Sequence, residues 1–323
     1  MSTLFSISPL RHSHSEALTT SQQAGKYIQQ NSFSSTPIPI PFLSTPESTE
    51  LWSTYENLLY SCLRTGDDKA AHSCLEKLGG RFGTNDERIM GLRGLYQEAM
   101  AEDQSALLQM LREYDQILAE NPTVTPVRKR RITLLQSLSR ESDAINGLID
   151  LLEASPTDIE AWAELCELYV SQGLYQQAEF CLEEILLSTP NAWNVHARLG
   201  EILYTSASTT QDQLGTLAES VRRFCRSIEL CNGYVRGYYG LKLASDRLSG
   251  ILSNSGKADS QTSNSSRNHE LAVPSVEVLQ KLNESATSML REMARKARLD
   301  DPRSPDIAFV EALLKASTVS GQR

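Results

Sequence analysis

The side chains of this sequence that are best suited to metal binding or redox chemistry are six cysteines and five histidines. A zinc site needs cysteines or histidines in close pairs, because several ligands must reach one ion. The only such pair, His12 and His14, lies in a stretch rich in serine and threonine, and no C-x-x-C pair occurs. Most cysteines fall among apolar positions with helical spacing, which is typical of free thiols in a reducing compartment. The sequence therefore predicts neither a metal site nor a cofactor.

Catalytic motifs are also missing from the sequence. It contains no G-x-x-x-x-G-K-[ST] phosphate loop, no G-x-G-x-x-G dinucleotide loop, no H-E-x-x-H zinc helix and no G-x-S-x-G nucleophile turn. We therefore expect no enzyme activity and no catalytic residues. The formal net charge of −9 argues against a general nucleic-acid binder, because phosphate backbones are bound by basic faces.

The element that must position any interacting residues is a repeat of 34 residues. Pro122, Pro156 and Pro190 share this spacing, and fixed periods of this size indicate stacked helical hairpins. Between the last two prolines, the break S-Q-G at 171–173 separates two helices, each with an apolar stripe. The expected core of this hairpin is Trp162, Leu165, Tyr169, Ala178, Leu182 and Pro190. In type and order these residues resemble the tetratricopeptide repeat, which implies an all-α superhelix.

Around this hairpin the sequence divides into four segments. Residues 1–45 are rich in serine, threonine and proline and are expected to be mostly disordered, with a short helix considered over 15–30. Residues 46–250 are expected to form an α-solenoid of about five to six tetratricopeptide hairpins. The polar insertion 251–274 is expected to be disordered. Residues 275–323 are expected to form closing helices that cover the last hydrophobic face.

Charge is distributed unevenly along the repeats. From Glu153 to Glu201 there are nine acidic residues and one base, Arg198. This region is either a solvated outer face or a docking face for basic segments of a partner, where electrostatics would supply orientation and on-rate. A basic patch of four residues lies just before it, at Arg128, Lys129, Arg130 and Arg131. The patch either meets an acidic partner or anionic lipid head groups, or is a charged exposed turn.

The first helices of a tetratricopeptide array line its concave face, so positions on them are candidates for partner contacts. The six candidates are Lys129, Thr133, Glu160, Glu167, Asn194 and Glu201. Some tetratricopeptide domains hold the C-terminal carboxylate of chaperones with Lys and Asn on their first helices. Here Glu167 and Glu201 take two of the corresponding places and would repel a carboxylate. This disfavours the alternative of a soluble adaptor or co-chaperone with a peptide-binding groove.

Several stretches go beyond the general repeat. They are "TGDD" at 65–68, "RKRRI" at 128–132, "EAWAELCELY" at 160–169 and "AEFCLEE" at 178–184. In this order and spacing they resemble subunit 2 of the endoplasmic reticulum (ER) membrane protein complex. The resemblance runs from about residue 50 to about residue 245. It does not include the N-terminal tract or the polar insertion.

The resemblance implies a non-catalytic tetratricopeptide scaffold on the cytosolic face of the ER membrane. The complex of that family inserts transmembrane segments, including tail anchors. The implied partners are cytosolic segments of its transmembrane subunits and a second soluble subunit, and membrane association would be indirect, through these partners. The sequence agrees, because no apolar run approaches the roughly 18 residues of a membrane span and the N-terminus lacks the pattern of a secretory signal.

Overall fold

The computed structural model describes residues 13–30, 49–255 and 273–300, together with residue 312. Every regular element in these residues is a helix, and none is a strand. The expected all-α fold is therefore confirmed. The chain divides between Leu151 and Leu152 into two compact units, which we call unit 1 and unit 2 and describe separately.

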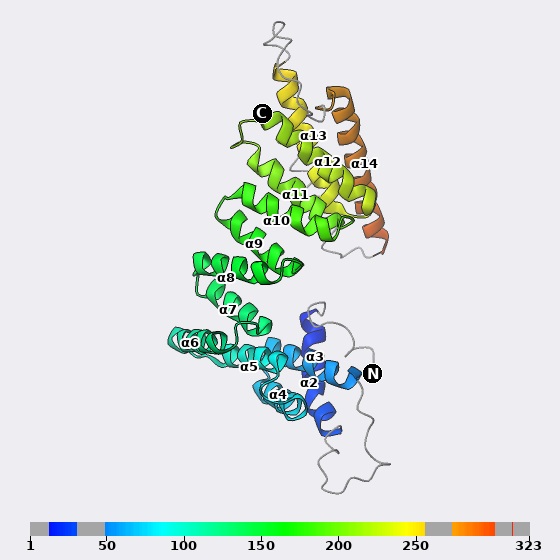
Figure 1. The fold of residues 1–323 in the computed structure, drawn as a ribbon. Coiled ribbons are helices and arrows are strands. Elements are labelled where there is room, and N and C mark those ends of the chain that lie inside the picture. Colours follow the sequence, from blue (N-terminus) through cyan, green and yellow to red (C-terminus); the bar gives the residue numbers. More distant parts are fainter. Residues whose placement is uncertain (1–12, 31–48, 256–272, 301–311, 313–323) are drawn as a thin grey trace. The chain divides into compact units, whose positions relative to one another are not determined.

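Unit 1 contains one helix that precedes the repeats and then three helical hairpins, drawn from blue to green in Figure 1. Its helices are α2 (His14–Gln30), α3 (Thr49–Thr65), α4 (Asp68–Phe82), α5 (Glu87–Met100), α6 (Gln104–Glu120), α7 (Thr125–Ser137) and α8 (Glu141–Ala154). The division between the units falls inside α8. The hairpins are α3–α4, α5–α6 and α7–α8, so α3, α5 and α7 are first helices.

Aspartates at the helix starts explain where several of these helices begin. The backbone N–H groups in the first turn of a helix have no hydrogen-bond partner inside the helix. In α4, α5 and α6 some of these groups donate to the side chain of the preceding aspartate, which is Asp67, Asp86 or Asp103. At the turn between α3 and α4, Gly66 has a φ of 73°, a conformation that glycine adopts without steric cost.

The core of unit 1 lies where α2 packs against α3 and α4. Ala24 of α2 is buried together with Tyr55, Leu58, and Cys74 of the first hairpin, and the rings of Tyr27 and Tyr55 meet edge to face, 5.8 Å apart. The short helix considered within the N-terminal tract is therefore present as α2, and it docks on the repeats. The other residues of the tract lie outside the described residues.

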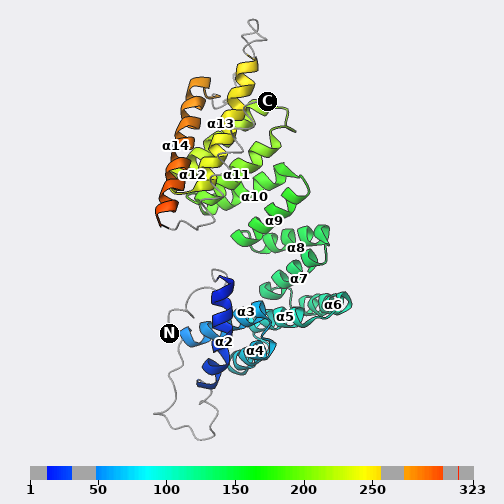
Figure 2. The ribbon, with the colours of Figure 1, turned by 180° about the vertical axis from the view of Figure 1, so that it is seen from behind.

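Unit 2 contains three more hairpins, α9–α10, α11–α12 and α13–α14. The helices are α9 (Ile159–Ser171), α10 (Tyr175–Ser188), α11 (Trp193–Ser206), α12 (Gln213–Leu230), α13 (Val235–Ser255) and α14 (Val276–Asp300). Figure 2 shows α14 lying along α13. The polar insertion expected at 251–274 begins inside α13, and its residues 256–272 lie outside the described residues.

The core of unit 2 is centred on Phe224 of α12, which is 1% exposed. Its ring fits beside Gly200 of α11 and Gly240 of α13, where an added Cβ would lie 3.1 Å and 2.1 Å from ring atoms. Small residues are thus needed here because the helices approach closely. Leu279 and Leu290 of α14 extend this core, so α14 serves as the expected closing helix. The second closing helix, expected near 304–318, lies outside the described residues except for residue 312.

The cysteines are free thiols, and four of them are buried. Cys62 and Cys74 belong to unit 1, and Cys166 and Cys181 to unit 2. Burial raises the pKa of Cys62 to about 11 and that of Cys74, Cys166 and Cys181 to about 12. These thiols therefore stay protonated at neutral pH and pack as small apolar groups.

Candidate functional site

The hairpin formed by α9 and α10 contains the six residues expected as repeat core, and only three of them are buried. Leu165, Ala178 and Leu182 are at most 4% exposed. Trp162 and Tyr169 are half-buried, and Pro190 is exposed. The expectation of a fully buried core is therefore wrong for these last three, because they lie at the edge of the hairpin.

Two of the residues outside the core hold turns in place instead. The Trp162 indole N–H donates to the Pro156 carbonyl at 2.8 Å, and its ring meets Phe180 edge to face at 5.9 Å. The Pro190 carbonyl accepts a hydrogen bond from Nε2 of His196 at 3.0 Å. The prolines of the 34-residue period thus receive hydrogen bonds from the helix that follows each of them.

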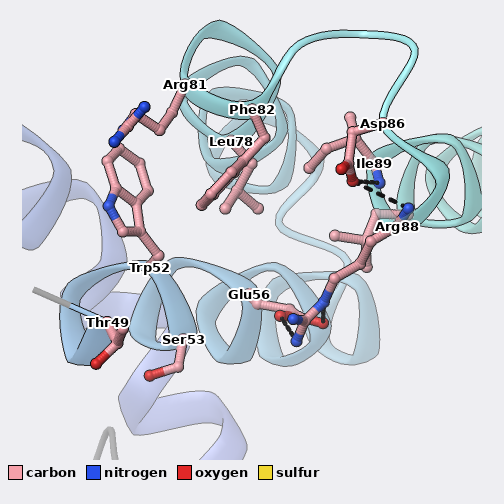
Figure 3. A pocket seen from close by; sticks show the side chains of 11 residues that line it. Thr49, Trp52, Ser53, Glu56, Leu78, Arg81, Phe82, Asp86, Arg88 and Ile89 are labelled. Carbon is pink, nitrogen blue, oxygen red and sulfur yellow. Dashed lines mark hydrogen bonds and ion pairs between the residues drawn. The ribbon is translucent and has the colours of Figure 1, made fainter.

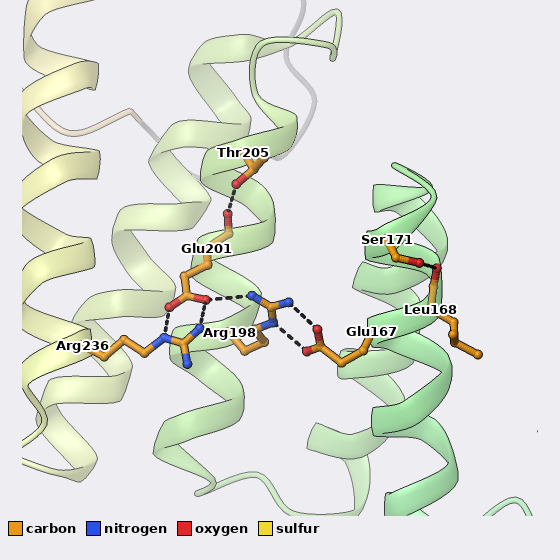
Figure 4. A network of polar contacts seen from close by, with 7 residues as sticks. All are labelled: Glu167, Leu168, Ser171, Arg198, Glu201, Thr205 and Arg236. Atoms are coloured by element: carbon orange, nitrogen blue, oxygen red, sulfur yellow. Dashed lines mark hydrogen bonds and ion pairs between the residues drawn. The ribbon is translucent and has the colours of Figure 1, made fainter. Parts of the chain in front are cut away.

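In unit 2, a chain of ion pairs joins three successive first helices, α9, α11 and α13 (Figure 4). Arg198 of α11 donates to Glu167 of α9 at 2.9 and 2.7 Å and to Glu201 of its own helix at 3.0 Å. Arg236 of α13 binds the same Glu201, with one contact at 2.6 Å. Each carboxylate is thus paired with an arginine of the next repeat, and Glu201 is shared by two.

Unit 1 repeats the arrangement on α3, α5 and α7. Arg88 of α5 pairs with Glu56 of α3 at 2.5 Å. Arg130 of α7 pairs with Glu98 of α5, with its Nε 3.1 Å from Oε1. The Tyr114 hydroxyl donates to the same carboxylate at 2.6 Å, so this pair lies in a largely buried network. We call these contacts in the two units the first-helix ion pairs.

The first-helix ion pairs correct our interpretation of the acidic region. Glu167 and Glu201 were expected to face a partner, but both bind arginines of their own chain. Arg223 of α12 also lies 3.7 Å from Glu183. The nine acids between 153 and 201 are therefore partly neutralised by arginines of later helices, and the expected repulsion of a carboxylate ligand is weaker than the sequence indicated.

The basic patch is also used largely within the chain. Arg128 donates to the backbone carbonyls of Pro122 and Asp150. Arg130 binds Glu98, and Arg131 binds Asp115 at 2.6 Å. These three guanidinium groups therefore bind helices of their own chain, and contact of the patch with an acidic partner or lipid stays a prediction.

The remaining candidates lie on first helices as expected. Thr133, Glu160 and Asn194 are exposed, and Lys129 is half-buried. The Thr133 hydroxyl donates to the Lys129 carbonyl at 2.9 Å, so its position on α7 is fixed by the helix itself. Their contact with a partner stays a prediction.

A pocket that sequence analysis did not identify lies in unit 1 between α3, α4 and α5 (Figure 3). It has a volume of about 620 Å³. Trp52 and Phe82 meet edge to face with ring centres 5.4 Å apart, and the Arg81 guanidinium lies over the Phe82 ring. The Glu56–Arg88 ion pair lines the other side. Trp52 and Phe82 lie on different helices, and neither is a position of the repeat motif. The only sequence signal for the pocket is therefore the spacing of 30 residues between these two aromatic residues.

Neither a metal-binding cluster nor a membrane-spanning helix is found in the described part of the chain. No group of three or more His, Cys, Asp or Glu side chains there could hold a metal ion. Among the helices that the structure describes, none combines the length and the apolar character that a membrane crossing requires.

Comparison with known proteins identifies the family. Residues 84–213 match the model of the EMC2 TPR-like repeat domain. The chain is 34% identical over 199 residues to TPR repeat protein oca3 of Schizosaccharomyces pombe, which covers 62% of this chain and 68% of that protein. The chain belongs to the family of ER membrane protein complex subunit 2. A further relative, ER membrane protein complex subunit 2-A of Xenopus laevis, is 36% identical over 196 residues, 61% of this chain and 63% of its own length.

The matched segment thus spans somewhat less than two thirds of the frog relative. A crystal structure of MamA has a TM-score of 0.41 at 15% identity, covering 59% of this chain and 93% of MamA. The family resemblance indicated by the four sequence stretches is confirmed by these relatives, and the match to the TPR-like repeat model confirms the tetratricopeptide character of the hairpins.

Proposed function

We propose that this protein is a non-catalytic scaffold subunit of an ER membrane protein complex. The observation that carries the proposal is its membership in the subunit 2 family, at 36% identity over 196 residues. We further propose that it lies on the cytosolic face of the ER membrane and binds cytosolic segments of transmembrane subunits and a second soluble subunit. In this role it supports the insertion of transmembrane and tail-anchored proteins.

The architecture supports binding rather than chemistry. A hairpin array presents long helix faces to extended or helical partner segments, and stable contacts of this kind bury on the order of 1,000 Å² or more. Unit 2 also exposes large apolar side chains: Phe180 and Leu187, seven residues apart on α10, are 54% and 77% exposed. Exposed apolar residues that lie on one helix face are typical of sites that a partner covers.

The first-helix ion pairs give the scaffold its rigidity in this proposal. They join successive repeats of each unit by charge-assisted contacts, which are geometrically specific for arginine and carboxylate. The partner contacts are then left to first-helix positions outside the pairs, with Thr133, Glu160 and Asn194 as the proposed residues. Because these are exposed, substitutions there should change binding with little effect on folding.

The test is affinity purification of the tagged chain from membranes in mild detergent, followed by size-exclusion chromatography and mass spectrometry. We expect one large particle that contains several transmembrane proteins. Asn194→Lys on α11 should weaken this co-purification, whereas Gln176→Lys, an exposed position on the second helix α10, should not. Recovery as a free monomer, or with a soluble chaperone alone, would contradict the proposal and favour the adaptor with a peptide groove.

A further inference from the structure

The helix α2 lies against α3 (Figure 1) and covers it mainly with small side chains. The four α2 residues that are at most 4% exposed form one helix stripe: Ala17, Thr20, Ser21 and Ala24. The larger Tyr27 and Ile28 are only partly buried. By contrast, α14 in unit 2 buries Leu279 and Leu290 completely. Because the free energy of burial scales with the apolar area removed from water, α2 is held more weakly than α14.

A buried hydroxyl group beneath α2 has no hydrogen-bond partner. Tyr55 of α3 is 1% exposed, and its ring meets Tyr27 of α2 edge to face. The Tyr55 hydroxyl is unpaired among the residues that the structure describes. Buried tyrosine hydroxyls are normally paired, and an unpaired one costs free energy. Release of α2 lets water reach this group, so the cost falls on the docked state.

The first turn of α2 is stabilised by contacts that do not involve α3. The Ser13 hydroxyl accepts a hydrogen bond from the Glu16 N–H at 3.3 Å, and the Glu16 carboxylate accepts one from the Ser13 N–H at 2.8 Å. This reciprocal pair is a capping box, which favours the start of a helix. The start of α2 therefore keeps its support when the helix leaves α3.

We propose that the face of α3 beneath α2, at Tyr55 and Cys62, is a binding site for an amphipathic helix of a partner protein, which displaces α2. The partner helix carries larger apolar side chains than the stripe of α2. It also carries a carboxylate or amide oxygen that accepts a hydrogen bond from Tyr55. Larger side chains hold two helices further apart, which leaves room for this acceptor. The inference rests on the proposed function, because it states the chemistry of one partner segment.

Hydrogen–deuterium exchange of the purified full-length chain, read by mass spectrometry, tests the release of α2. The amides of α2 should exchange at least about tenfold faster than those of α3, because α2 leaves while the hairpin stays folded. Equal exchange in the two helices would mean that α2 is released only when the hairpin unfolds. That result would overturn the proposal.

Tyr55→Phe removes the unpaired hydroxyl and keeps the ring. The exchange of α2 should become about tenfold slower, because the docked state no longer contains a buried hydroxyl without a partner. The matched control is Tyr60→Phe on the same helix, which removes a hydroxyl that hydrogen-bonds Glu56 and should leave the exchange of α2 unchanged. The exchange of α3 reports whether each variant is folded. An unchanged α2 rate in folded Tyr55→Phe would contradict the proposal.

A disulfide that fixes α2 on α3 tests the partner helix. The Ser21 hydroxyl hydrogen-bonds the Cys62 thiol, so Ser21→Cys brings two sulfur atoms together. The purified, tagged variant is oxidised, its disulfide is confirmed by mass, and it is added to solubilised membranes of cells that lack the natural chain. We expect at least one protein of the recovered particle to be missing with the oxidised variant and to return after reduction. The parent chain, treated with the same oxidant, is the control.

The outcomes of this experiment separate the inference from the proposed function. If the oxidised and reduced variants recover the same proteins, the partner helix does not use this face, although the scaffold role stands. If the parent chain also recovers no such particle, the proposed function fails and this inference fails with it.

Discussion

Ser139 has a backbone conformation that most side chains avoid. Its φ is 58°, in the turn between α7 and α8. One period of 34 residues later, Gly173 holds the corresponding turn between α9 and α10 with a φ of 73°. A side chain in this left-handed region costs about 1–2 kcal/mol, so the repeat stores strain at the position where its neighbour has glycine.

The first prediction concerns this turn. Ser139→Gly should raise the free energy of unfolding by about 0.5–1 kcal/mol, because the relief of strain exceeds the extra freedom that glycine has in the unfolded chain. Gly173→Ser should lower it by a similar amount. Urea denaturation of both variants measures the effect, and a neutral or destabilising Ser139→Gly would show that the serine turn is not strained.

A second residue-level prediction concerns His196 and pH. Its Nε2 donates to the Pro190 carbonyl, while Nδ1 is buried without a hydrogen-bond partner among the described residues. Burial lowers the pKa of His196, and the nearby Arg223 and Arg226 lower it further. The unfolded chain therefore binds the proton more readily, so stability is fully present above about pH 6.5 and falls as pH drops through the folded pKa.

Denaturation at pH 7.5 and pH 5.5 tests this sign. His196→Gln keeps an amide that can donate to Pro190 but cannot take up a proton. The loss of stability between the two pH values should therefore be smaller in His196→Gln than in the parent protein. An equal loss in both would assign the pH dependence to other groups.

At the level of helices, the first-helix ion pairs predict an effect on stability. Glu201 is 23% exposed and binds both Arg198 and Arg236. Glu201→Gln should lower the free energy of unfolding by about 1–2 kcal/mol. This loss is larger than that expected for an exposed ion pair and smaller than that for a fully buried one. The matched control is Glu229→Gln, which removes an exposed pair within α12 and should cost at most about 0.5 kcal/mol.

Salt separates this effect from a loss of packing. The difference between Glu201→Gln and the parent should shrink in about 1 M salt, where the Debye length falls to about 3 Å. A difference that does not change with salt would mean that the carboxylate acts through shape and not through charge. Circular dichroism in denaturant at low and high salt gives both numbers.

The helices of this fold were more predictable than the contacts between them. Pro122, Pro156 and Pro190 identified the hairpins, because a proline period reflects the local chemistry of helix ends. The first-helix ion pairs were missed because charges were counted along the chain. Their signal is present in the sequence, since Glu167 and Arg198 lie 31 residues apart and Glu98 and Arg130 lie 32 apart, close to one repeat.

Burial was the harder property to predict. Trp162 takes the tryptophan place of the repeat motif, but the motif does not state how much of the ring a neighbour covers. That depends on Phe180, from the other helix of the hairpin, which leaves the ring half-exposed. Trp162→Ala should accordingly cost less than the 3–5 kcal/mol or so of a fully buried aromatic.

For the whole molecule, the two units predict how the chain unfolds. The buried cluster around Tyr55 lies in unit 1 and the buried cluster around Phe224 lies in unit 2, and repeat proteins are held together by nearest-neighbour contacts. Trp52 lies in unit 1, whereas Trp162 and Trp193 lie in unit 2. Fluorescence of a Trp52→Phe variant therefore follows unit 2, and that of a variant with both other tryptophans replaced by phenylalanine follows unit 1.

We expect the two fluorescence transitions to have different midpoints in urea. Circular dichroism, which reports helix in both units, should then span the two transitions in each variant. Coincident curves from all three probes would mean that the chain unfolds as a single cooperative unit. In each variant the fluorescence transition is compared with the circular dichroism transition of the same protein, so effects of the substitutions on stability do not enter the comparison.

The buried cysteines can report local unfolding of each unit without any substitution in the chain. Cys62 and Cys74 lie in one unit and Cys166 and Cys181 in the other, and a shielded, protonated thiol reacts with an alkylating reagent only when its surroundings open. Alkylation followed by peptide mass analysis would therefore give a separate opening rate for each unit. The same measurement works inside an assembled particle or a cell extract, where optical signals of one subunit are lost among those of its neighbours.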